Sequence, residues 1–252
     1  MGKPAFLIIG AQKAGTTSLY GWLRHHPGVT MTQTKELHFF DREFHRGTEW
    51  YFEQFSGPCP GEATPYYLFH PLAPKRAAEA IPDAKLIVLL RDPVSRAWSH
   101  YHHVRRQGNE PLSFLDAIEV EKLRMRGEVG KILEDPRYFS LNHQKFSYLT
   151  RGLYADQILR WLRYFPREQL LAIETSALHR DPQGSLNRVS AFLEIEPVTL
   201  PSFPRYNTGG TYPEIDPEVS AYFRTMFAAQ NKRLIDVLGD QAPSFAFPDT
   251  AA

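Results

Sequence analysis

The sequence contains a single cysteine, Cys59, among 252 residues. One cysteine cannot form an intrachain disulfide or supply a cysteine-based zinc site, so neither device stabilises this fold. An excess of charge of one sign is also missing, because 29 basic residues stand against 28 acidic ones and leave a formal charge of +1. Without a basic field, the composition argues against a nucleic-acid coat protein and against a membrane-surface binder.

Long hydrophobic runs are missing as well. No apolar run approaches the ~20 residues that a transmembrane helix needs, and the apolar segment at Phe6 begins too early for a signal peptide. We therefore expect no membrane span, no nucleic-acid partner and a cytoplasmic location. The sequence is equally compatible with a domain cut from a longer protein, and it leaves the oligomeric state open.

The composition is sufficient for one large folded domain covering residues 1–252. Its hydrophobic content of 42% and aromatic content of 13% can fill a sizeable core. Buried strands are predicted at 6–10, 85–90 and 169–173, with a short one at 29–31, and their unbroken apolar runs suit a parallel sheet covered on both faces. Strands alternate with helices along the chain, which predicts an α/β fold with three α/β/α layers around a central parallel sheet.

The helices are predicted from apolar residues at helical spacing. Residues 57–61 are expected to form a loop, and residues 107–147 to form helical pieces and loops. The predicted helices cover 16–26, 47–55, 74–80, 93–104, 152–165, 185–193 and 217–238.

The stretch at 6–18, FLIIGAQKAGTTS, carries the strongest functional signal. Four apolar residues lead into a turn bracketed by Gly10 and Gly15 and then into a helix, which is the arrangement of an anion-binding loop at a helix N-terminus. The nucleoside-triphosphate loop G-x-x-x-x-G-K-[ST] is matched by both glycines and Thr17, but Thr16 replaces its lysine. Because the lysine sits inside the loop as Lys13, the pattern weakens the case for a kinase.

A second motif follows the predicted strand at 85–90. The segment 90–101, LRDPVSRAWSHY, places Arg91 at the strand end and Ser99 on the following helix. A guanidinium is a forked, permanent cation and a hydroxyl adds a directed donor, so the pair suits a second phosphate. Together the two motifs resemble those of the sulfotransferases that use 3′-phosphoadenosine 5′-phosphosulfate (PAPS), with residues 6–18 as the 5′-phosphosulfate loop and Arg91 with Ser99 at the 3′-phosphate.

Other segments extend the resemblance over almost the whole chain as a single sulfotransferase domain. They are similar to the heparan-sulfate-type branch and its bacterial relatives. The segments are KELHFFD at 35–41, EATPYY at 62–67, GLY at 152–154, WLRYFP at 161–166 and PEIDP at 213–217.

This resemblance implies a transferase that moves a sulfuryl group from PAPS to an acceptor hydroxyl, or less readily an amine. It implies that Glu36 is the general base, that Lys13 neutralises the leaving phosphate, and that His38 positions the acceptor or handles protons. Asp41 is expected to orient Lys13 or its loop. No metal is required, because a sulfuryl group carries less charge than a phosphoryl group.

The same resemblance assigns the binding residues. Cofactor binding is expected from Lys13, Ala14, Gly15, Thr16, Thr17, Ser18, Arg91, Ser99, Thr208, Gly209, Gly210 and Thr211. Substrate binding is expected from Asp41, Thr64, Tyr67 and Tyr154.

The sequence departs from the animal glycan enzymes at two places. Ala63 stands where they have a lysine, and residues 208–210, TGG, stand where they have Lys-Gly-Arg. Losing these cations favours a less charged acceptor, such as a simple sugar, a lipid head group or a carrier-bound acyl chain. Two alternatives remain: a P-loop kinase of a small metabolite, and a nucleotide-binding module without catalysis.

Overall fold

The computed structural model describes residues 2–206 and 212–247. Five parallel strands form one sheet in the order β2-β3-β1-β4-β5. The strands are β1 (Phe6–Gly10), β2 (Thr30–Met31), β3 (Pro60–Ala63), β4 (Lys85–Leu90) and β5 (Leu170–Glu174). β1 lies at the centre and all of its residues are buried, as expected for a strand covered on both faces. The predicted α/β fold with a central parallel sheet is confirmed.

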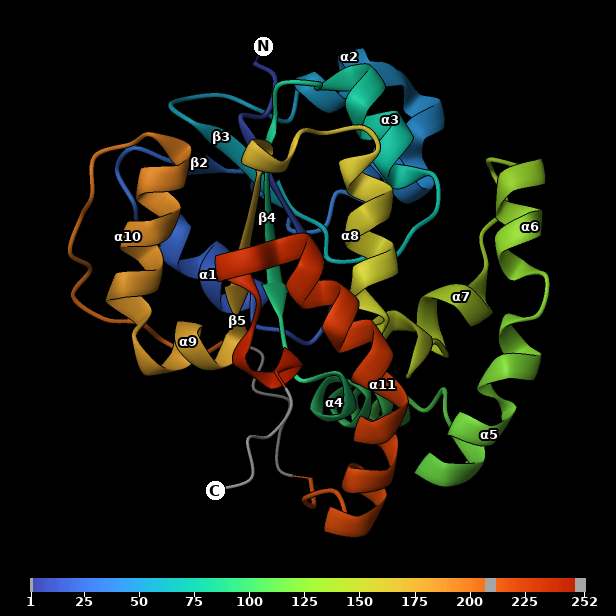
Figure 1. The fold of residues 1–252 in the computed structure, drawn as a ribbon. Helices are drawn as coiled ribbons and strands as arrows, with labels where there is room; N and C mark the ends of the chain where they lie inside the picture. The colour runs from blue at the N-terminus through green and yellow to red at the C-terminus, as the bar shows by residue number, and fades with distance from the viewer. Residues whose placement is uncertain (1, 207–211, 248–252) are drawn as a thin grey trace. The chain divides into compact units, whose positions relative to one another are not determined.

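The helices alternate with these strands along the chain (Figure 1). Their bounds are α1 (Thr16–Leu23), α2 (Gly47–Phe52), α3 (Ala73–Ala80), α4 (Pro93–Arg106), α5 (Phe114–Met125), α6 (Glu128–Glu134), α7 (Leu141–Lys145), α8 (Tyr154–Leu162), α9 (Thr175–Arg180), α10 (Pro182–Leu193) and α11 (Pro217–Leu238).

The chain divides into two compact units, residues 1–90 with 159–208 and residues 91–158 with 209–252. The first contains the whole sheet, with α1 packed on β1, β2 and β3, and with α9 and α10 packed on β5. Figure 1 shows α1 and α10 on one side of the strands and α3 on the other. The second has a helical core of buried apolar residues from α4, α5 and α11. The prediction of a single domain over the whole chain stays a prediction.

β3 is the strand that the sequence did not predict, because residues 57–61 were expected to be a loop. Its residues are Pro, Gly, Glu and Ala, which carry no apolar signal. Gly61 is required by packing: a Cβ there would lie 2.3 Å from the ring of Phe6 on β1. The strand forms because it pairs with β1 on one side and β2 on the other, so its stability comes from distant partners.

Candidate functional site

The loop between β1 and α1 has the geometry of an anion cradle. Gly15 is the N-cap of α1 with φ of 94°, a left-handed conformation that favours glycine. The first N–H groups of a helix have no partner within it, and no side chain in the described part of the chain caps α1. These donors and the positive end of the helix dipole therefore suit a phosphate or sulfate group.

Neighbouring strands hold this loop in place. The hydroxyl of Thr175, the first residue of α9, shares its single proton between the carbonyl oxygens of Ala14 at 2.8 Å and Leu90 at 3.0 Å. A Cβ at Gly10 would lie 2.7 Å from the Cβ of Leu68, so only glycine fits at the end of β1. These contacts fix the cradle to the edge of the sheet.

The predicted cofactor residues of this loop differ in what they expose. The side chains of Thr16 and Ser18 are buried, and the Ser18 hydroxyl accepts a hydrogen bond from the Tyr206 N–H at 3.1 Å. The backbone N–H of Ser18 donates to the carbonyl of Gly15 at 3.0 Å, so of these two residues Thr16 is the one that can offer a ligand its backbone N–H group. The side chains of Lys13 and Thr17 are only half-buried. Their cofactor contacts stay predictions, and those of Thr208, Gly209, Gly210 and Thr211 fall outside the described residues.

Glu36 lies at the same edge of the sheet as the cradle. Its backbone N–H donates to the carbonyl of Ala63, the last residue of β3, at 3.1 Å. Ala63 is in register with Ile8 of β1, two residues before the cradle begins. The carboxyl ends of parallel strands are where ligands bind in open α/β sheets, so the backbone pairing places Glu36 at an edge suited to chemistry.

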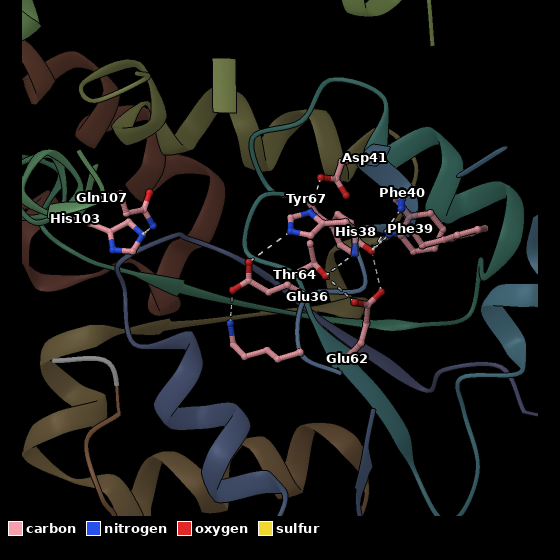
Figure 2. A network of polar contacts seen from close by, with 11 residues as sticks. Glu36, His38, Phe39, Phe40, Asp41, Glu62, Thr64, Tyr67, His103 and Gln107 are labelled. Atoms are coloured by element: carbon pink, nitrogen blue, oxygen red, sulfur yellow. Dashed lines mark hydrogen bonds and ion pairs between the residues drawn. The ribbon is translucent and has the colours of Figure 1, made fainter. Parts of the chain in front are cut away.

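The side chains of Glu36, His38 and Asp41 form a row (Figure 2). One oxygen of Glu36 pairs with the ammonium of Lys35, and the other lies 3.6 Å from Nε2 of His38. Nδ1 of His38 lies 2.7 Å from Oδ2 of Asp41. The buried carboxylate of Asp41 thus contacts His38, and the expectation that Asp41 orients Lys13 or its loop stays a prediction.

These contacts define the charge state of the row. Burial disfavours the charged forms of both Glu36 and His38. For Glu36, the hydrogen bonds and the charges of His38 and Lys35 outweigh burial and lower its pKa to about 2. In the same way, Asp41 and Glu36 overcome burial and raise the pKa of His38 to about 9. At neutral pH Glu36 is therefore a carboxylate able to accept a proton, and His38 is an imidazolium that only donates hydrogen bonds.

The backbone is strained at the residues that were predicted to be catalytic. Five described residues other than glycine have positive φ, and they include Lys13 at 70°, Glu36 at 62° and His38 at 54°. Such conformations cost of order 1–3 kcal/mol each and cluster at functional sites. This observation is independent of the sequence motifs, and all three predicted catalytic residues are among the five.

The row predicts a pH dependence of stability. Because the folded-state pKa of His38 lies above its ordinary value, its contribution is fully present below about pH 6.5 and is lost as the pH rises through about 9. Urea unfolding should show a fall on the order of 2 kcal/mol across this window. The variant His38→Gln should show a smaller fall in the free energy of unfolding. An equal dependence of this free energy on pH in the two proteins would contradict the row of contacts.

In the second unit, Arg91 follows directly on β4 and precedes α4. Asp92 caps α4 by accepting a hydrogen bond from the Ser95 N–H at 2.8 Å. The Tyr154 hydroxyl donates to the carbonyl of Arg91 at 2.9 Å, so it helps to orient the backbone there. Ser99 is buried on α4. The 3′-phosphate contacts of Arg91 and Ser99 stay predictions.

Three of the residues predicted to bind substrate, Thr64, Tyr67 and Tyr154, are almost completely buried. Their hydroxyls engage protein groups, so direct contact with an acceptor stays a prediction for them and for Asp41. Sequence reasoning assigned no role to Glu62, although its carboxylate is the common partner of Thr64 and Tyr67. The sequence did contain a sign of this network, because hydroxyl residues stand two and five positions after the acidic residue Glu62.

Within residues 2–206 and 212–247, no group of three or more His, Cys, Asp or Glu side chains is arranged to hold a metal ion. Over the same ranges, no helix combines the length and apolar character needed to cross a membrane.

Comparison with known proteins gives a consistent result. The family described as "Sulfotransferase domain" matches residues 3–202. The human bifunctional heparan sulfate N-deacetylase/N-sulfotransferase 3 is 32% identical over 282 residues, which cover 96% of this chain but 31% of that protein. The mouse heparan sulfate glucosamine 3-O-sulfotransferase 3B1 is 35% identical over 199 residues, covering 77% of this chain and 47% of that protein. The chain therefore spans between about a third and a half of these relatives.

A solved structure is similar over nearly the full length of both chains. The sulfotransferase from Alicyclobacillus acidocaldarius is 31% identical, covers 94% of this chain and 96% of its own, and superposes with a TM-score of 0.78. The parallel sheet and the P-loop-like turn of the present chain therefore belong to a fold that a bacterial sulfotransferase shares.

Proposed function

Because this chain belongs to the sulfotransferase domain family, we propose that it transfers the sulfuryl group of PAPS to a hydroxyl of an acceptor. When bound, PAPS supplies an activated sulfuryl group on a phosphate leaving group. The residues present suit it: an N-terminal cradle with a lysine in its loop, a guanidinium at Arg91 and a carboxylate at Glu36.

One observation carries this proposal. The cradle after β1 and Glu36, bonded through its backbone to the end of β3, lie at the carboxyl edge of adjacent strands. A transfer in line needs a charge-stabilising group and a base at one locus. Within the first unit, the sheet places an anion cradle with Lys13 and an ionised carboxylate along one edge, which supports transfer over simple nucleotide binding.

Each residue then has a definite task. Glu36 accepts the proton of the acceptor hydroxyl as the new oxygen–sulfur bond forms, and Lys13 balances the negative charge on the phosphate oxygen that leaves. His38 stays protonated because of Asp41, so it orients Glu36 and does not compete for the proton. Arg91 and Ser99 bind the 3′-phosphate, and Tyr154 supports Arg91 through its backbone.

We propose a weakly charged acceptor, with a sugar hydroxyl as the first candidate. The relatives are named for heparan sulfate, which supports a glycan. The cation that the glycan enzymes carry at the position of Ala63 is missing, and Ala63 is buried at the end of β3. A neutral or singly charged sugar, lipid head group or carrier-bound hydroxy-acyl chain fits this edge better than a polyanion.

The cofactor assignment can be tested by thermal unfolding in the presence of EDTA. The product 3′-phosphoadenosine 5′-phosphate, at a hundredfold excess over its Kd, should raise the melting temperature by about 5–10 °C. Adenosine 5′-phosphate should raise it much less, and Arg91→Ala with Ser99→Ala should abolish the difference. Equal stabilisation by both nucleotides would contradict the 3′-phosphate site. In a parallel series without EDTA, stabilisation by ATP with Mg²⁺ but not by 3′-phosphoadenosine 5′-phosphate would favour a kinase.

The activity itself is tested with labelled PAPS and a panel of acceptors. We expect transfer to neutral sugars, lipid head groups or carrier-bound acyl chains to exceed transfer to heparan-type polysaccharides, phenols and sterols. Nucleotide binding without transfer to any acceptor would point instead to a binding module that has lost catalysis.

A further inference from the structure

The buried carboxylate of Glu62 is the centre of a network outside the row described above. It is completely buried on β3 and accepts hydrogen bonds from three hydroxyls. Oε1 accepts from Tyr51 at 2.7 Å and Tyr67 at 2.9 Å, and Oε2 accepts from Thr64 at 2.7 Å. Burial raises the pKa of Glu62, while the three hydroxyls act in the opposite direction. A carboxylate without a charged partner is a costly choice for a structural core.

The chemical character of Glu62 sets the direction of these hydrogen bonds. Each of the three hydroxyls donates its proton to an oxygen of Glu62, and a hydroxyl has only one proton to donate. The oxygen of each hydroxyl is then left with lone pairs that can accept but with no proton to donate elsewhere. Tyr67 uses this capacity to accept the Phe39 N–H at 2.8 Å, and Thr64 accepts the His38 N–H at 3.4 Å. Figure 2 shows Thr64 and Tyr67 beside the Glu62 carboxylate, with Phe39 and His38 on their other side.

We propose that Glu62 is a positioning residue for sulfuryl transfer, acting through Tyr67 and Thr64 on the backbone that carries Glu36 and His38. The proposal rests on the proposed function, since it assigns Glu62 to the same reaction. By fixing the polarity of the two hydroxyls, Glu62 makes both of them acceptors for N–H groups of the 38–40 segment. A glutamine at position 62 would donate its amide proton to one of the hydroxyls. That hydroxyl would then turn its own proton towards an N–H group, which could no longer donate to it.

The strain in this segment explains why such support is needed. Glu36 and His38 both have positive φ, a conformation that persists only where surrounding contacts enforce it. Further support comes from the other side, where Nη1 of Arg76 donates to the carbonyl of Phe40 at 2.9 Å. The backbone from 38 to 40 is thus held through its N–H groups by the Glu62 network and through a carbonyl by Arg76.

Tyr51 and Tyr67 provide a matched pair of variants. Both side chains are buried and both donate to the same oxygen of Glu62. Of these two hydroxyls, that of Tyr67 is the one for which the described part of the chain also shows accepted backbone N–H groups of the 38–40 segment. Tyr51→Phe therefore removes a bond to Glu62 alone, whereas Tyr67→Phe also releases the segment that carries the row.

The test compares wild type, Tyr51→Phe, Tyr67→Phe and Glu62→Gln in three measurements. These are kcat and KM with labelled PAPS, binding of 3′-phosphoadenosine 5′-phosphate by calorimetry, and the titration of His38 by NMR. We expect Tyr67→Phe and Glu62→Gln to lower kcat about tenfold or more with unchanged nucleotide affinity. Both should move the His38 titration downwards from about pH 9, while Tyr51→Phe keeps kcat and the titration near wild type.

The outcomes separate this inference from the proposed function. Equal kcat and equal His38 titration in the two tyrosine variants would overturn the positioning role, because loss of a bond to Glu62 would then have no specific effect on the row. If wild type transfers sulfate to no acceptor, the proposed function fails, and the NMR titration still decides whether Glu62 controls His38. Should Glu62→Gln fail to fold, the tyrosine pair carries the test alone.

Discussion

Replacing Glu36 with glutamine should lower kcat by roughly 10²–10⁴ while the affinity for 3′-phosphoadenosine 5′-phosphate stays near that of wild type. Glutamine keeps the size and a hydrogen-bonding oxygen but cannot accept a proton from the acceptor hydroxyl. The backbone bond to Ala63 does not depend on the side chain, so the loop is expected to stay in place. The measurement is steady-state transfer from labelled PAPS, with calorimetry for the nucleotide.

A control variant and a pH profile sharpen this test. Glu53→Gln changes an exposed carboxylate at the end of α2, removes the same charge, and should leave kcat within twofold of wild type, about the effect of 0.4 kcal/mol.

Since the pKa of Glu36 is about 2 and that of His38 about 9, kcat/KM should be flat from pH 5 to 8. It should fall as His38 loses its proton. Unchanged turnover in Glu36→Gln would remove the base assignment.

The cradle was predictable because its signals are local. The turn at Gly15 and the helix beginning at Thr16 follow from adjacent residues, and the structure places α1 at that boundary. Strand β4 was predicted with its observed bounds, since its apolar run is continuous. These features need only a few neighbouring residues to form, so a single sequence contains most of the relevant information.

The support of the site was not predictable to the same extent. Lys13, Glu36 and His38 carry no sign of a positive φ in their residue type, because that conformation is imposed by their surroundings. Asp41 was expected to orient Lys13 or its loop, which stays a prediction, and the contact of its carboxylate with His38 was not foreseen because the sequence does not reveal side-chain partners. The hydroxyls that meet at Glu62 come from three separate positions along the chain.

β3 illustrates the same limit at the level of a strand. Pro60 and Gly61 are unfavourable in most strands, and no propensity argument selects them. The strand exists because β1 and β2 offer free edges on either side, and because Phe6 fills the space that a side chain at Gly61 would take. Such long-range pairings decide both the sheet order and the position of Glu36 along its edge.

Replacing Lys13 with alanine should reduce both kcat and nucleotide affinity, because the ammonium group is proposed to balance the leaving phosphate. Losing a positive charge preorganised for a developing anion typically costs 10²–10³ in kcat, and losing a charged hydrogen bond costs about tenfold or more in affinity. Lys13 has φ of 70°, so alanine there also keeps the strain of a left-handed residue. The matched variant Lys13→Gly relieves that strain and should melt at a higher temperature than Lys13→Ala. If the positive charge of Lys13 is required, both variants lose sulfuryl transfer to the same extent despite their different stabilities. Near-normal turnover in Lys13→Gly would show instead that the backbone of the cradle is sufficient for the reaction without its lysine.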